Sequence, residues 1–95
     1  MMKQTITIEK GKLTAYHIDL GNAPLLILQA RKGYIMCGYL NMNAANKLGD
    51  TAGKVTGVKS FDDMLNSTVI EVSENAKVLG LTEGMTARDF LNTLM

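Results

Sequence analysis

The stretch Gly33-Tyr34-Ile35-Met36-Cys37-Gly38-Tyr39-Leu40 carries apolar side chains on both of its alternating sets of positions. A strand with this pattern is covered by protein on both faces, so we predict that the stretch is a strand in the middle of a sheet. A second continuous apolar run, Leu25 to Leu28, lies just upstream and is predicted to be buried on both sides for the same reason. The turn formers Arg31-Lys32-Gly33 join the two runs, which are therefore predicted to be antiparallel neighbours.

Two further strands are predicted upstream of these runs. In Lys3 to Glu9, and again in Leu13 to Leu20, apolar residues alternate with polar ones, which is the pattern of a half-buried strand. The segment Lys10-Gly11-Lys12 between them is typical of a tight hairpin turn. Pro24 can open a strand but cannot lie inside a ladder, so it marks the start of the next strand. The first forty residues are therefore predicted to form a four-stranded antiparallel meander.

The second half of the chain is predicted to alternate helices and strands. A short helix is expected from Asn43 to Leu48, with Asn43 as its N-cap. A strand is expected from Ala52 to Lys59 and another from Thr68 to Val72.

Three more helices are predicted, over Ser60 to Asn66, Ser73 to Leu79 and Thr86 to Leu94. The first and the third begin with a hydroxyl residue that is followed three positions later by aspartate, which is the spacing of a capping box. The predicted fold class is α+β, as one compact domain over residues 1–95. It has a mixed, mainly antiparallel sheet, made of the meander and the two later strands, with helices packed chiefly on one face.

Composition and charge exclude several classes of function. A formal net charge of +1 over 95 residues gives no electrostatic surface for nucleic acid or for an anionic membrane. The single cysteine cannot form a disulfide within the chain, and the N-terminus lacks the apolar run of a signal peptide, so we expect a cytoplasmic protein. No apolar run is long enough to predict a transmembrane helix.

Several blocks of sequence also point to a family. They are GYIMCGYL at 33–40, AGKVTGVKSFDDML at 52–65, LGL at 79–81 and GMTARDFL at 84–91. In this order they resemble the YunC-like family of small bacterial and archaeal proteins, over about two thirds of the chain. The resemblance implies a compact cytoplasmic α/β domain. It implies no established activity, and therefore no catalytic residues that can be carried over.

Two residues are candidates for catalysis. Cys37 is the only cysteine, and a thiolate is a strong nucleophile that can work with a histidine from elsewhere in the chain. His17 is the only histidine and shares a strand face with Asp19, so the two could form an oriented acid/base pair. The alternative for Cys37 is a small buried hydrophobe, because apolar surroundings raise the pKa of a thiol and make it inert. The alternative for His17 is a surface residue of a half-exposed strand.

The candidate ligand-binding residues are of three kinds: residues beside Cys37, glycines that let a ligand approach the backbone, and residues near free amides at helix N-termini. They are Tyr34, Gly38, Tyr39, Gly53, Gly57, Ser60 and Arg88. Core packing and plain helix capping are the alternatives for them. One cysteine and one histidine cannot furnish a defined metal site. Residues 49–55 lack the spacing of a P-loop, and no cofactor is expected.

Two hypotheses of function remain open. The first is an oligomeric module without catalysis that binds a small ligand or another protein. The second is a small-molecule enzyme that uses Cys37 with Tyr34, Tyr39 and His17 in thiol or acid/base chemistry. In either case a chain this short, with so many apolar strand positions, is expected to form a homo-oligomer, most simply a symmetric dimer.

Overall fold

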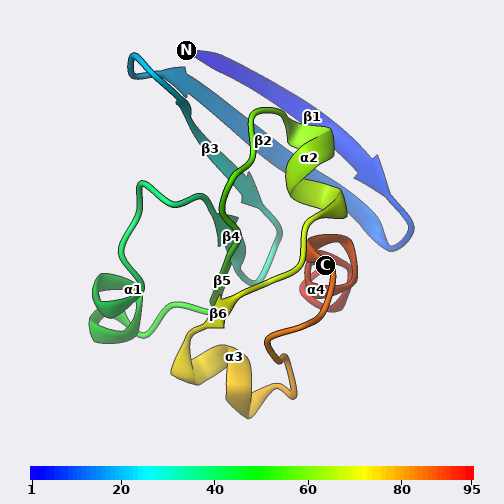
Figure 1. Ribbon diagram of the computed structural model, residues 1–95. Helices are drawn as coiled ribbons and strands as arrows, with labels where there is room; N and C mark the ends of the chain where they lie inside the picture. The colour runs from blue at the N-terminus through cyan, green and yellow to red at the C-terminus, as the bar shows by residue number, and fades with distance from the viewer.

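The computed structural model describes all residues from Met1 to Met95, which form one six-stranded sheet and four helices (Figure 1). The strands lie side by side in chain order. They are β1 (Met2–Ile8), β2 (Gly11–Asp19), β3 (Pro24–Gln29), β4 (Tyr34–Met36), β5 (Ala52–Lys54) and β6 (Glu71–Val72). Every neighbouring pair is antiparallel except β4 and β5, which are parallel. The predicted α+β class with a mixed, mainly antiparallel sheet is confirmed.

The predicted meander is also confirmed. β1, β2, β3 and β4 follow one another through short turns, and Ala15 of β2 lies opposite Leu28 of β3. Both of these residues are fully buried, so the alternation in the sequence directs the apolar face of the strands toward the core. The first hairpin turn lies slightly earlier than predicted, because β2 already begins at Gly11.

The central strand is shorter than its sequence predicts. β4 ends at Met36, and the next four residues form a turn in which the amide of Leu40 donates to the carbonyl oxygen of Cys37 at 3.2 Å. Gly38 and Tyr39 are exposed in this turn. The prediction of a strand from Gly33 to Leu40 is therefore wrong beyond Met36, because apolar alternation alone does not distinguish a strand from the turn that follows it. Its position between two other strands is confirmed.

The later strands are shortened as well. The strand predicted from Ala52 to Lys59 ends at Lys54. Beyond it Gly57 adopts a left-handed backbone with φ of 72°, which does not fit a ladder. Of the strand predicted from Thr68 to Val72, only β6 is paired with the main sheet, and Thr68 forms an isolated bridge with Thr86.

The helices are α1 (Met42–Leu48), α2 (Phe61–Asn66), α3 (Glu74–Val78) and α4 (Ala87–Thr93). The oxygens of Ser60 and Thr86 accept the amides of Asp63 (3.1 Å) and Asp89 (3.2 Å), which confirms these two predicted caps. The prediction of Asn43 as the cap of α1 is wrong, because Asn41 accepts the amide of Asn43 instead, at 2.7 Å. None of the helices combines the length and the apolar character that crossing a membrane requires.

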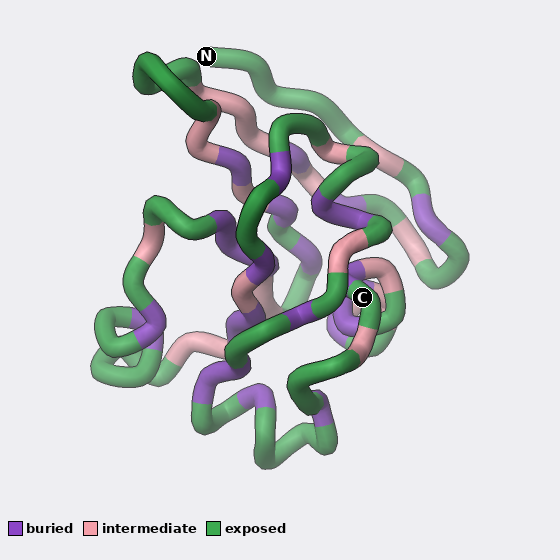
Figure 2. The backbone as a smooth tube through the Cα atoms, viewed as in Figure 1, coloured by how far each residue is buried: buried purple, intermediate pink, exposed green.

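The core has two parts, on opposite faces of the sheet. Figure 2 shows where the buried residues lie along the backbone. The larger part lies between the sheet and helices α2, α3 and α4, and Phe90 of α4 lies in it, fully buried. The smaller part lies under α1, where Met42 and Ala45 pack on Met36 of β4 and Ala52 of β5. Three of the four helices therefore cover one face, as predicted, and α1 covers only the β4 and β5 part of the other.

Candidate functional site

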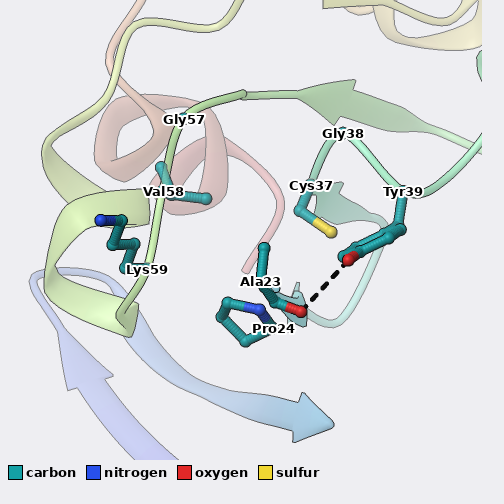
Figure 3. Close-up of a pocket in the computed structure, with 8 residues that line it drawn as sticks. All are labelled: Ala23, Pro24, Cys37, Gly38, Tyr39, Gly57, Val58 and Lys59. Atoms are coloured by element: carbon teal, nitrogen blue, oxygen red, sulfur yellow. Dashed lines mark hydrogen bonds between the residues drawn. The ribbon is translucent and has the colours of Figure 1, made fainter. Parts of the chain in front are cut away.

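A groove of about 300 Å³ opens where the parallel strands β4 and β5 end (Figure 3). We call it the apolar groove. Its lining residues come from the start of β3, from the turn after β4 and from the segment after β5. They are Ala23, Pro24, Cys37, Gly38, Tyr39, Gly57, Val58 and Lys59. In sheet proteins, the carboxyl ends of neighbouring parallel strands are a common place for ligands, because the connections diverge there and leave a crevice.

Local sequence explains how these residues meet. Pro24 begins β3, and the turn at Gly38 and Tyr39 folds the chain back over it. The hydroxyl of Tyr39 donates to the carbonyl oxygen of Ala23 at 3.2 Å and closes one end of the groove (Figure 3). Val58 projects into the groove from the opposite wall, whereas the side chain of Lys59 runs along the outer side of that wall, away from Cys37 (Figure 3).

Cys37 forms part of the groove wall and is only 3% exposed. The backbone amide of Leu26 donates to its Sγ atom at 3.3 Å. The buried side chain also belongs to the main apolar core, so the cysteine combines a packing role with contact to the groove. Of the predicted ligand-binding residues, the structure brings Gly38, Tyr39 and Gly57 to the same groove as Cys37.

His17 lies outside the apolar groove. The predicted pair with Asp19 is formed, since Nε2 of His17 lies 3.0 Å from Oδ1 of Asp19. The imidazole also meets the ring of Phe61 edge to face, with ring centroids 6.1 Å apart. His17 lines a separate hollow with Met1, Met2, Ile18 and Asp19. The structure therefore does not assemble His17 and Cys37 in one site.

Tyr34 is held on the other face of the sheet. Its ring packs on the small core under α1, and its hydroxyl donates to Oδ2 of Asp50 at 2.7 Å. Burial, together with this hydrogen bond and the negative charge of Asp50, raises the pKa of Tyr34 to about 12. The phenol therefore stays protonated at neutral pH and acts as a donor that ties the start of β4 to the segment before β5.

The remaining candidates are dispersed. Gly53 is buried, and a side chain added there would contact Phe90 at 2.9 Å, so its role is close packing. Ser60 caps α2. Arg88 pairs with Glu9 at 3.3 Å, and the pKa of Glu9 is lowered, first by a hydrogen bond from Asn92 and to a lesser extent by Arg88. No three side chains of the metal-binding types are placed to hold one ion together.

A second hollow, of about 400 Å³, adjoins the apolar groove and shares Gly38 and Tyr39 with it. We call it the polar hollow, because four of its eight lining residues carry charged or amide side chains. It is lined by Gly38, Tyr39, Leu40, Asn41, Met42, Asn43, Lys54 and Glu71. Sequence reasoning missed it, because only the pairing of β5 with β6 places Lys54 opposite Glu71.

The fold and the two adjoining hollows define a small α+β domain with a cleft at its parallel strand ends. The chain belongs to the family described as a domain of unknown function, DUF1805, whose model matches residues 36–94. It is 32% identical over 94 residues to the uncharacterized protein YunC of Bacillus subtilis (strain 168), which covers 95% of this chain and 93% of YunC. The resemblance to the YunC-like family is thus confirmed.

The fold is shared with a solved structure as well. The crystal structure of TA1206, a protein of unknown function from Thermoplasma acidophilum, matches this chain with a TM-score of 0.94 and 44% sequence identity. The match covers 99% of this chain and 92% of TA1206.

Proposed function

We propose that this protein is a small-ligand-binding module and that the apolar groove is its binding site. One observation carries the proposal: a partly enclosed, mostly apolar hollow of about 300 Å³ lies at the carboxyl ends of two parallel strands. This volume lies at the lower end of the range for small-molecule sites, which are lined mainly by apolar groups with a few polar ones.

The construction of the groove supports a binding role. Pro24 and Cys37 lie on or directly beside strands, and the Tyr39 hydroxyl bond ties the turn after Cys37 to Ala23, the residue before Pro24. A site held by such elements loses little freedom when a ligand enters, because the groove is already formed. Apart from Lys59 on the outer side of the wall, the thiol of Cys37 and the hydroxyl of Tyr39 are its polar side-chain groups, and they suit a ligand with a mainly apolar body.

The alternative function is an enzyme that uses Cys37 with Tyr34, Tyr39 and His17. The groove brings Cys37 to Tyr39 but leaves Tyr34 bonded to Asp50 and His17 bonded to Asp19. General-base activation of a thiol requires a base within hydrogen-bond reach, and Sγ of Cys37 instead accepts the amide of Leu26. The geometry therefore favours binding over catalysis.

Titration with a panel of small molecules, followed by amide chemical shifts, tests the binding proposal. The panel holds carboxylic acids, amines, amino acids and nucleosides, each with an apolar portion. We expect at least one class to shift the amides of Gly38, Tyr39 and Val58, because these residues line the groove. Ala23→Trp is expected to abolish those shifts by filling the groove, whereas Asn22→Trp, on the same exposed turn but outside the lining, leaves them unchanged.

If no class of compound moves the groove amides, or if Ala23→Trp binds as the wild type does, the proposal is overturned. One-dimensional spectra of both variants show whether they are folded, so a loss of binding through unfolding is recognised.

We propose further that the protein is a homo-oligomer, most simply a symmetric dimer. The face of β2 and β3 away from α2 and α4 carries the half-buried pair Tyr16–Ile27 and the half-buried Ile18, and α1 does not extend over it. β1 is moreover an edge strand of seven residues without proline. Exposed edge strands and apolar faces of this kind are usually covered by another chain, or are protected from pairing by charged residues, proline or a bulge. A second copy provides a self-complementary cover for them.

Sedimentation velocity tests the dimer. We expect the wild type to sediment with about twice the chain mass of 10.3 kDa. Ile27→Lys should sediment as a monomer, because it places a charge in the centre of the apolar face. Leu48→Lys, on the exposed side of α1, is the matched control and should remain a dimer. A wild-type monomer at about 100 μM would refute the dimer, since interfaces of standard size bind well below this concentration.

A further inference from the structure

The apolar groove and the polar hollow adjoin each other at the end of β4. Both are walled by Gly38 and Tyr39, which follow directly after this strand. Lys54 faces the α1 side of the sheet, as its register partner Met36 does, and Cys37 faces the other side. Because Gly38 has no side chain, a ligand that lies across it can contact both the apolar groove and the polar hollow.

Lys54 and Glu71 give the polar hollow two opposite charges. They are register partners on the antiparallel strands β5 and β6, so their side chains leave the sheet on the same face. Neither makes an ion pair or a side-chain hydrogen bond within the chain, although Arg88 with Glu9 and Lys77 with Glu74 do pair elsewhere. The ammonium group and the carboxylate of the hollow are thus both free to bind a ligand.

We propose that the ligand of this cleft is an α-amino acid with an apolar side chain, an inference that rests on the binding function proposed above. Its carboxylate pairs with Lys54 and its ammonium group pairs with Glu71, inside the polar hollow. Its side chain crosses Gly38 and enters the apolar groove, where Pro24 and Val58 form the walls. The structure thereby assigns the head group and the body of one molecule to the two compartments.

The two charges of the polar hollow favour an α-amino acid over a ligand that carries a single charge. An anion alone pairs with Lys54 and leaves Glu71 facing a like charge, and a cation alone does the reverse, whereas a zwitterion matches both. Asn43 and Asn41 line the same hollow, and the side-chain amide of Asn43 and the NH₂ group of Asn41, whose Oδ1 caps α1, add hydrogen-bonding groups for the head. The groove, in contrast, has Lys59 as its one charged lining residue, and that side chain runs along the outer side of the wall, away from Cys37 (Figure 3). Charged side chains are therefore disfavoured there.

Three probes that share one carbon skeleton test the inference: L-leucine, 4-methylpentanoate without the amine, and 3-methylbutylamine without the carboxylate. We expect L-leucine to shift the amides of both compartments, with Val58 and Glu71 as reporters. Each probe that lacks one charge should bind about tenfold more weakly or worse, because a hydrogen-bonded charge pair is lost. L-glutamate should not shift the groove amides, because its second carboxylate has no partner there.

Two variants of the protein provide a second test of the inference. Glu71→Gln keeps the shape of the side chain but removes its charge, and should weaken L-leucine about tenfold or more while leaving 4-methylpentanoate unchanged or tighter. Glu83→Gln makes the same chemical change on an exposed loop outside both hollows and should bind L-leucine as the wild type does.

The outcomes separate this inference from the binding function itself. If all three probes bind equally and shift only the groove amides, the amino-acid assignment is overturned and the binding function stands. The assignment also fails if Glu71→Gln and Glu83→Gln bind L-leucine alike. If neither these probes nor the wider panel shift the groove amides, both proposals fail.

Discussion

Replacing Phe90 by alanine is expected to lower the free energy of unfolding by about 3–5 kcal/mol. The ring is fully buried between α4 and the sheet, directly over Gly53. Removing it takes away a large buried apolar area and leaves a cavity that the surrounding strands cannot fill. Because a domain of this size is stabilised by roughly 5–15 kcal/mol in total, the loss is a large share of the stability. Urea-induced unfolding, followed by circular dichroism, measures it.

Val78→Ala is the control for this experiment, since Val78 is 83% exposed and should cost about 0.5 kcal/mol or less. The contact with Gly53 allows a sharper check. A methyl group at Gly53 would lie 2.9 Å from Phe90, so Gly53→Ala alone should cost about 1–3 kcal/mol. In the Phe90→Ala background the same change should cost less, because the methyl group enters the cavity. If the stability losses of Gly53→Ala and Phe90→Ala simply add up in the double variant, the two residues do not share this contact.

Replacing Gly33 by alanine is expected to cost about 3 kcal/mol, because the added methyl group would overlap the carbonyl oxygen of Thr51. That oxygen already accepts the amide of Tyr34 at 3.1 Å, so the strain falls on the junction that holds β4 against β5. The methyl group would also lie 2.9 Å from Leu94, on the C-terminal segment that packs there. Backbone atoms move less readily than side chains, so the clash is relieved only by displacing β4. Chemical denaturation measures the loss.

Gly38→Ala is the matched control for Gly33→Ala. A methyl group at Gly38 would make an ordinary contact of 3.5 Å with Thr56, and the residue does not have a positive φ. We expect a change within about 0.5 kcal/mol. Equal losses at the two glycines would mean that the close approach of Gly33 to Thr51 does not govern stability here.

Much of the fold could be predicted from the sequence because its signals are local. Alternation in β1 and β2, the apolar run of β3, and the hydroxyl residues Ser60 and Thr86 before their helices each report on a few neighbouring residues. The ends of β4 and β5 could not be predicted from such local signals. Residues beyond Met36 are apolar because they line a groove, and residues beyond Lys54 leave the sheet at a left-handed glycine.

The candidate site was only partly predictable, for a related reason. Cys37, Gly38, Tyr39 and Gly57 were recognised as unusual residues of predicted strands, and they do share a groove. The local pattern predicts Pro24 only as the start of a strand, since nothing in it indicates that the turn after β4 folds over this residue. Lys54 and Glu71 are 17 positions apart in the sequence, and only the register of β5 with β6 places them opposite one another.

The strand order of the sheet has a consequence for how the chain acquires its structure. Each strand lies beside the one made just before it, so no strand has to be inserted between two that are already paired. The sheet can therefore grow in the order of synthesis, one edge at a time. The helix that brings Phe90 and Leu91 into the core, α4, follows all six strands in the chain. During translation the part of the apolar face that α4 covers consequently stays open until this helix has left the ribosome.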